Sequence, residues 1–165
     1  MQLMKTRVLV TGANGLLGYN LVQQLRENYD VTAIDLAEHA DFDFEDVDFQ
    51  IGDITNKAET LEIVRSVHPK FIFNAAAYTN VDKSETDKEV CWKANVEGVE
   101  YLAYATKLTE SKLIHVSTDY IFDGTAAPYV EDDRPHPLGY YGKSKLAGEN
   151  ALVASGANYA IARTM

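Results

Sequence analysis

The residues best suited to chemistry are a tyrosine and a lysine four positions apart, Tyr141 and Lys145, in the segment YYGKSK. On a helix, side chains at this spacing project from one face, about one turn from each other. The spacing therefore predicts an ammonium beside a phenol. A positive charge about 4 Å away is worth about 4 kcal/mol at an effective dielectric constant of about 20. We expect this charge to lower the pKa of Tyr141 from its usual value of about 10, so that the phenol can exchange a proton with an alkoxide.

A hydroxyl that can act on the same oxygen follows the strand predicted over 112–116 (KLIHV). Ser117, Thr118 and Asp119 close this strand, and the helix predicted over 140–155 begins with the tyrosine and lysine. In doubly wound sheets, ligands bind outside the carboxyl ends of the strands. We expect Thr118 to donate a hydrogen bond to the carbonyl oxygen that Tyr141 protonates. The structural alternative for Thr118 is a capping hydroxyl.

A glycine-rich turn near the start of the sequence is suited to binding a diphosphate. Segment 5–18, KTRVLVTGANGLLG, combines a short buried strand, three glycines spaced three residues apart and an apolar helical pattern. Without Cβ atoms the backbone can bend sharply, and a diphosphate can approach its N–H groups at the positive end of the helix. The alternative is a tight turn without a ligand. We expect cofactor contacts from Gly12, Asn14, Gly15, Leu16, Leu17 and Gly18.

The next three predicted strands supply candidates for the rest of a dinucleotide site. Asp35 lies 17 residues after Gly18, at the end of the strand predicted over 30–36, where a carboxylate can accept hydrogen bonds from the adenosine ribose. Asp53 and Ile54 follow the strand predicted over 48–51 and can flank an adenine ring. An acidic strand end and the N-cap region of the helix predicted over 56–67 are the structural alternatives. The strand predicted over 70–74 leads into Ala75, Ala76 and Ala77, which leave room for a flat ligand, although tight helix packing also favours small residues.

An acidic segment bears on the choice of cofactor. Residues 38–48 (EHADFDFEDVD) hold six acidic residues and no Lys or Arg. The 2′-phosphate of NADP would meet carboxylates and no cation there, so we expect NAD(H) to be preferred over NADP(H). A solvated acidic loop is the structural alternative.

Strand-like and helix-like segments alternate along the whole sequence, which predicts an α/β fold. We expect a doubly wound parallel sheet of the Rossmann type, with strand order 3-2-1-4-5-6 and helices on both faces. A single long amphipathic helix is predicted over 85–108, and a sixth strand over 158–162. The chain of 165 residues is expected to form one dinucleotide-binding domain over 1–165.

Composition excludes several classes of function. The net charge of −10 disfavours nucleic acid as a partner, because phosphodiester backbones would be repelled. No apolar run reaches the roughly 18 residues of a membrane span, and no leader with a cleavage site opens the sequence, so we expect a cytoplasmic protein. A single cysteine, Cys91, and four scattered histidines give no metal-binding pattern. No metal is therefore expected.

Together these motifs resemble the extended short-chain dehydrogenase/reductases, and most of all the dTDP-4-dehydrorhamnose reductases. The resemblance rests on VLVTGANGLLG, GDIT, NAAAYTNVDKSE, HVSTDYIFDG and PLGYYGKSKLAGE, and it covers nearly the whole sequence. It implies that Thr118, Tyr141 and Lys145 are the catalytic trio, with Lys145 also holding the nicotinamide ribose. It further implies that four residues lie near a sugar nucleotide, namely Tyr78, Val81, Asp82 and Tyr120.

The reaction implied by the resemblance is hydride transfer from NAD(P)H to the C4 ketone of a dTDP-linked 4-keto-6-deoxyhexose. Related dehydratases have a glutamate where this sequence has Tyr120, so dehydration is disfavoured. Members of the family are longer, and their remaining chain builds much of a substrate-binding lobe that this sequence lacks. Two alternatives stay open: a non-catalytic regulatory subunit similar to the beta subunit of methionine adenosyltransferase, and a sugar-nucleotide epimerase. A homodimer is compatible with apolar helix faces on both sides of the sheet.

Overall fold

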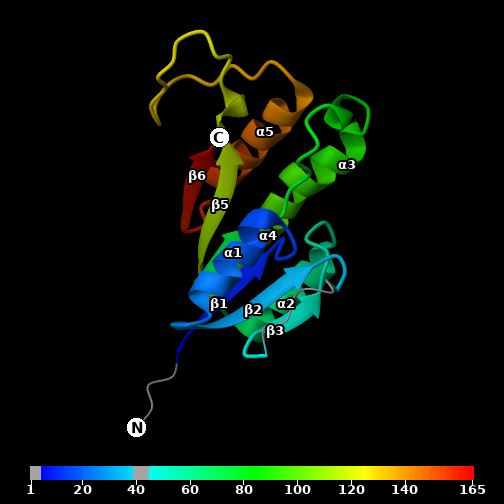
Figure 1. Cartoon of the computed structure of the whole chain (residues 1–165), viewed down its shortest axis with the longest axis vertical. Coiled ribbons are helices and arrows are strands. Elements are labelled where there is room, and N and C mark those ends of the chain that lie inside the picture. Colours follow the sequence, from blue (N-terminus) through cyan, green and yellow to red (C-terminus); the bar gives the residue numbers. More distant parts are fainter. Residues whose placement is uncertain (1–4, 39–44) are drawn as a thin grey trace.

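The computed structural model describes residues 5–38 and 45–165, and it contains a six-stranded parallel sheet with helices on both faces (Figure 1). The strand order β3-β2-β1-β4-β5-β6 confirms the predicted doubly wound α/β fold. The strands are β1 (Thr6–Thr11), β2 (Tyr29–Asp35), β3 (Asp48–Ile51), β4 (Phe71–Asn74), β5 (Lys112–Thr118) and β6 (Tyr159–Thr164).

The helices divide between the two faces of the sheet, and each face has its own apolar cluster. On one face α1 packs through Val22 against Val8 and Val10 of β1. On the other face α2, α4 and α5 pack against the sheet around Leu9 and Leu113. The helices are α1 (Leu16–Leu25), α2 (Lys57–Val67), α3 (Lys88–Trp92), α4 (Gly98–Thr109) and α5 (Tyr140–Ser155).

Burial on both faces explains why β1 reads as a continuous apolar run. Val8, Leu9 and Val10 have no solvent exposure, although successive side chains of a strand point to opposite faces. A strand covered on both sides has no polar face, so its sequence does not alternate. The apolar run of β1 therefore marks it as a central strand of the sheet.

The carboxyl ends of β1, β4 and β5 meet at one edge of the sheet. Thr11 of β1 lies beside Asn74 of β4, which lies beside His115 of β5. From β1 the chain continues toward β2 and β3, and from β4 it continues toward β5 and β6, on the opposite side. The gap between the ends of β1 and β4 is thus the switch point at which doubly wound folds bind their ligands.

The single long helix predicted over 85–108 is wrong in two respects. Glu85 belongs to a 3-10 turn, Lys83–Glu85, and α3 begins only at Lys88. Between α3 and α4 the helix widens into a π segment, Lys93–Glu97. Within this segment Asn95 is buried and its side-chain amide bonds the backbone of Tyr78 at both the N–H and the carbonyl. The widened turn therefore directs a polar side chain of a core helix toward the loop after β4.

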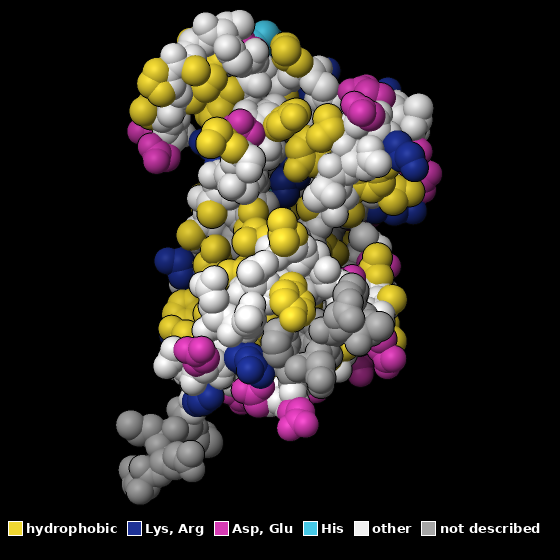
Figure 2. Space-filling model, in the orientation of Figure 1, with side chains coloured by type: hydrophobic (Ala, Val, Ile, Leu, Met, Phe, Trp, Pro, Cys, Tyr) yellow, Lys and Arg dark blue, Asp and Glu magenta, His cyan; other side chains and the backbone are white. Residues whose placement is uncertain are grey.

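Three surface features concern membrane spans, acidic side chains and metal-ligating groups. Among the described residues no helix is both long and apolar enough to cross a membrane. Acidic side chains are spread over the face shown in Figure 2. The described residues also hold no group of three or more metal-ligating side chains placed to bind an ion.

A glycine on α5 sets how closely that helix approaches the π segment. A Cβ atom at Gly148 would lie 2.2 Å from the backbone carbonyl oxygen of Asn95. We predict that Gly148→Ala lowers the free energy of unfolding by about 1–3 kcal/mol, because the two backbones must separate. Chemical denaturation measures this change. Helix propensity alone would instead stabilise the variant by about 1 kcal/mol, so a stabilised Gly148→Ala would contradict the packing described here.

Candidate active site

A cleft of about 390 Å³ opens at the switch point between β1 and β4. It is bounded by the turn after β1, the end of β2, the segment after β3 and the loop after β4. Of the predicted cofactor residues, nine line it together: Gly12, Asn14, Gly15, Asp35, Asp53, Ile54, Ala75, Ala76 and Ala77. Sequence reasoning did not assign the other six lining residues to the site, although Thr79 lies within NAAAYTNVDKSE; they are Ile34, Leu36, Gly52, Thr55, Thr79 and Ala94.

Gly12 allows the floor of this cleft to form. Its backbone lies in the left-handed region, at φ +71°, and a Cβ atom there would be 2.6 Å from the backbone nitrogen of Ala76. Both facts require glycine. The turn after β1 can therefore pass directly against the loop after β4.

The other two glycines of the turn have different surroundings. A Cβ atom at Gly18 would lie 2.0 Å from the carbonyl oxygen of Gly12, so Gly18 lets α1 pack onto the turn. At Gly15 a Cβ atom would meet only the same oxygen, at 3.3 Å, and Gly15 faces the cleft. Gly15 is also the residue from which α1 starts, so the free N–H groups of the first helical turn lie next to the cleft. The Leu16 and Leu17 side chains are exposed and do not line it.

Asp35 fastens the glycine turn to the end of β2. Its two carboxylate oxygens accept hydrogen bonds from the backbone N–H of Asn14 at 2.9 Å and from that of Leu36 at 2.7 Å. The Asn14 side chain adds a bond to the carbonyl of Ala37 at 2.6 Å. Each carboxylate oxygen can accept a further hydrogen bond, so Asp35 can bind a hydroxyl in the cleft while it holds the turn.

Thr118, Tyr141 and Lys145 come together where β5 ends and α5 begins. Tyr141 is half-buried, and the nearby Thr118 hydroxyl, which donates to Asp119 at 3.3 Å, acts on the pKa of its phenol. Thr118 also accepts a hydrogen bond from the backbone N–H of Tyr120 at 3.2 Å, which fixes its side chain at the strand end. Lys145 is only 2 % exposed and donates to the carbonyl of Val116 at 2.8 Å.

The predicted lowering of the Tyr141 pKa by Lys145 is wrong for this arrangement. Burial raises the pKa of Tyr141, and the nearby Thr118 hydroxyl opposes this only in part. The lysine ammonium points to the backbone of β5 instead of the phenol. Burial also lowers the pKa of Lys145 to about 8, which leaves it mostly charged at neutral pH. Helical spacing placed both residues on one face but could not show where the longer side chain ends.

Of the four predicted sugar-nucleotide residues, Tyr120 lies beside the catalytic candidates. Its ring packs edge-on against that of Tyr141, with centroids 5.7 Å apart. The Tyr78 phenol donates to Asp87 at 2.8 Å, and burial together with this carboxylate raises the pKa of Tyr78 to about 12. Val81 is half-buried and Asp82 is exposed, and both precede the turn Lys83–Glu85.

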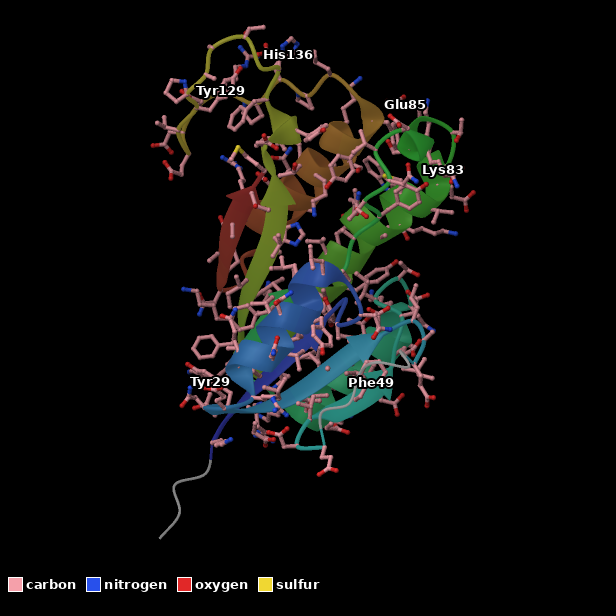
Figure 3. All side chains as sticks on the ribbon, in the orientation of Figure 1. Tyr29, Phe49, Lys83, Glu85, Tyr129 and His136 are labelled. Carbon is pink, nitrogen blue, oxygen red and sulfur yellow. The ribbon has the colours of Figure 1, made fainter. Side chains whose placement is uncertain are left out.

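Glu85 joins this turn to the start of α5. Its carboxylate accepts a hydrogen bond from the backbone N–H of Tyr140 at 2.7 Å, and the neighbouring Tyr140 phenol donates to the carbonyl of Lys88 at 3.2 Å. Figure 3 shows Glu85 and Lys83 in the loop beside the first turn of α5. Side chain to backbone hydrogen bonds therefore hold the loop after β4 near Tyr141. The sequence patterns did not predict these bonds.

The long loop 122–139 is fastened above the same edge of the sheet. One oxygen of Asp123 contacts His136, and the other accepts hydrogen bonds from Thr125 and Tyr129. Together these contacts hold the pKa of the Asp123 carboxyl well below its usual range. Figure 3 shows Tyr129 and His136 on this loop. Arg163 pairs with the buried Glu149 at 2.8 Å and donates to a loop carbonyl.

Comparisons with known proteins agree with this geometry. The family model described as "RmlD substrate binding domain" matches residues 6–165. A curated dTDP-4-dehydrorhamnose reductase from Aggregatibacter actinomycetemcomitans is 43% identical over 161 residues, which is 96% of this chain and 50% of the relative. The Escherichia coli protein of that name is 38% identical over 158 residues, 95% of this chain and 50% of the relative. The chain thus spans about half the length of the curated relatives it matches.

Solved structures show the same fold. The crystal structure of dTDP-4-dehydrorhamnose reductase from Bacillus anthracis in complex with NADP superposes with a TM-score of 0.85 at 36% identity, covering 97% of this chain and 53% of that one. A UDP-glucose 4-epimerase from Brucella ovis in complex with NAD has a TM-score of 0.86 at 27% identity, covering 96% of this chain and 51% of that one.

The direction of the Tyr141 pKa can be measured directly. We predict that the alkaline absorbance titration of the chain, minus that of Tyr141→Phe, has its midpoint above 10.0, because burial disfavours the phenolate. Taking the difference isolates this phenol from the other tyrosines. A midpoint below 10.0 would restore the expectation that a nearby ammonium dominates.

Proposed function

The chain belongs to the RmlD substrate-binding domain family, and we propose that it is the dinucleotide-binding part of an NAD(P)H-dependent reductase of a nucleotide-linked 4-keto-6-deoxy sugar. The observation that carries this proposal is the joint placement of the cleft and of Tyr141, Thr118 and Lys145 at one edge of the sheet. The names of the curated relatives support dTDP-4-dehydrorhamnose as the substrate.

The cleft has the features that a dinucleotide requires. We assign the diphosphate to Gly15 and the first N–H groups of α1, where no side chain intervenes and Leu16, Leu17 and Gly18 contribute backbone only. Asp35 would accept hydrogen bonds from the adenosine ribose. Asp53 and Ile54 would flank the adenine, and the alanines after β4 would leave space for the flat ligand.

The three catalytic candidates would act on the ketone. When bound, the reduced nicotinamide supplies the hydride that adds to the carbonyl carbon. Tyr141 would transfer its phenolic proton to the carbonyl oxygen, so the ketone is reduced to an alcohol and both atoms gain a hydrogen. Thr118, at the end of β5 near Tyr141, would donate to that oxygen and hold it in place. Lys145 would hold the nicotinamide ribose and stabilise the tyrosinate that remains, because its ammonium is mostly charged at neutral pH.

Substrate contacts would come from the loop after β4 and from the end of β5. We assign Tyr78, Val81 and Asp82 to the sugar nucleotide on the grounds that Glu85 holds this loop next to α5. Tyr120 would pack against the sugar, since its ring is exposed beside Tyr141. A cytoplasmic location and a homodimer also remain our predictions from the sequence.

The proposal is tested by reduction of dTDP-4-dehydrorhamnose with NADH or NADPH, using the native gene product. We predict that Tyr141→Phe lowers kcat by about 100-fold or more, because the alkoxide loses its proton donor. Tyr140→Phe is the matched control: its phenol donates to a backbone carbonyl and its turnover should stay near that of the wild type.

The same assay separates the two other candidate functions. No cofactor oxidation by the wild type would favour a regulatory subunit. A protein purified with NAD that interconverts sugars without net oxidation would favour an epimerase, a class represented among the structural neighbours.

We further propose that NAD(H) is preferred over NADP(H), since Asp35 would repel a 2′-phosphate. The acidic segment 38–48 would also repel this phosphate; its residues 39–44 lie outside the described part of the chain. Both cofactors occur among the structural neighbours: the Bacillus anthracis reductase is in complex with NADP and the Brucella ovis epimerase with NAD.

A charge-neutral substitution tests this preference. We predict that Asp35→Asn, which keeps an acceptor for the Asn14 N–H, weakens NADH binding by about tenfold and leaves NADPH binding unchanged or improved. Calorimetric titration of both cofactors measures the ratio. Asp35→Ala serves as the comparison that also removes the bond to the turn. Equal losses for NADH and NADPH in Asp35→Asn would contradict the preference.

A further inference from the structure

Three buried side chains from neighbouring strands form a hydrogen-bonded row under the catalytic edge. Thr11, Asn74 and His115 have no solvent exposure, and the strand register places them side by side. The Thr11 hydroxyl donates to the Asn74 carbonyl oxygen at 2.6 Å, and the Asn74 amide nitrogen lies 3.1 Å from His115 Nδ1. An amide NH₂ can only donate, so Nδ1 accepts this bond.

This bond determines the state of the histidine. Burial and the nearby Lys145 lower the pKa of His115 to about 3, so its ring is neutral at physiological pH. With Nδ1 accepting, the single ring proton lies on Nε2. Among the described residues, His115 Nε2 has no hydrogen-bond partner. A buried donor in this position costs free energy unless it is bonded.

A second unpartnered polar atom lies on the same face of β5. Ser117 is 3 % exposed, and within the described part of the chain its hydroxyl also has no partner. Because His115 and Ser117 are two residues apart on a strand, their side chains point to the same face. Leu113 shares this face and packs in the cluster that includes Leu152 of α5.

Lys145 completes the group. It reaches β5 from α5 and donates to the carbonyl of Val116, which is joined to Ser117 by a peptide bond. Its charge also acts on His115. The ammonium has three hydrogens and uses one for this carbonyl. The site thus holds two or more donors and a single hydroxyl that can accept.

We propose that His115 and Ser117 bind a buried water molecule beside Lys145, and that this water holds the lysine charged and in place. The water accepts hydrogen bonds from His115 Nε2–H and the ammonium and donates one to Ser117 Oγ, which gives both unpartnered side chains a partner and the ammonium a second one. His115 and Ser117 are therefore positioning residues that act through the lysine. The Asn74 amide cannot relay a proton, so the row fixes the orientation of the histidine. The proposal rests on the assignment of Lys145 to the active site.

Within the described ranges, two other titratable groups act on Lys145. Glu149 lies on its own helix and is paired with Arg163, and Cys91 faces it from α3. None of these groups is changed by substitution of Ser117. A change in the titration of Lys145 after that substitution would thus report the hydroxyl and its water.

The test is an NMR titration of the cofactor-free chain with isotopically labelled lysine, in which Lys145→Met assigns the signal. The wild-type midpoint is expected at about 8. Loss of a solvating water disfavours the charged form, so we expect Ser117→Ala to lower the midpoint by about one pH unit, a tenfold change in the acid dissociation constant. Ser111→Ala is the matched control, since it removes a buried hydroxyl just before the same strand, and should leave the midpoint unchanged.

Substitution of His115 gives a second test in the same Lys145 titration. His115→Leu should lower the midpoint as Ser117→Ala does, whereas His115→Gln, which keeps an N–H at the end of its side chain, should restore it. In the wild type, the imidazole nitrogens should report the Nε2–H tautomer, and this proton should show a cross-peak to water. An unchanged or raised midpoint in Ser117→Ala, or a wild-type Nε2 without proton or water contact, would overturn the proposal. Because no cofactor is present, this result is independent of whether the chain binds a dinucleotide.

Discussion

The backbone contact between Gly12 and the loop at Ala75–Ala76 is the constraint from which the rest of the site follows. No side chain fits between these two segments, because a Cβ atom at Gly12 would lie within 2.7 Å of three of their backbone atoms. The contact closes the floor of the cleft where the chain departs from β1 and β4 in opposite directions. Gly18 then brings α1 down onto the same turn, so the free N–H groups at its start lie at the cleft.

Burial, more than pairing of charges, sets the protonation of the catalytic candidates. The Lys145 ammonium donates to a backbone carbonyl and is buried under a packed helix. Burial lowers its pKa to about 8, so the group stays mostly charged at neutral pH. Tyr141 is protected from solvent to a smaller degree, and its pKa is raised. A phenol that keeps its proton is suited to act as an acid in the direction of reduction. In the proposed reaction the lysine would stabilise the tyrosinate only after the proton has left.

Much of the fold was predictable from sequence because its signals are local. The buried run Val8–Leu9–Val10, the glycine spacing and the strand-ending Asp35 can each be recognised within a short segment. The cleft confirms that the glycine turn and Asp35 meet. The π segment around Asn95 was not predictable, because it is associated with a contact to Tyr78 in a distant loop. The end point of the Lys145 side chain was missed for a similar reason. It depends on a carbonyl of a neighbouring strand, which helical periodicity does not contain.

We propose above that the cleft between β1 and β4 binds a nicotinamide dinucleotide with its diphosphate at the glycine turn. Titration of the isotopically labelled chain with NADH, followed through its backbone amide signals, tests this most directly. We expect saturable shifts at Gly12, Asn14, Gly15 and Asp35 and at the alanines after β4, while amides on the far edge of the sheet stay unchanged. Shifts confined to another face, or no saturable shifts at all, would contradict it.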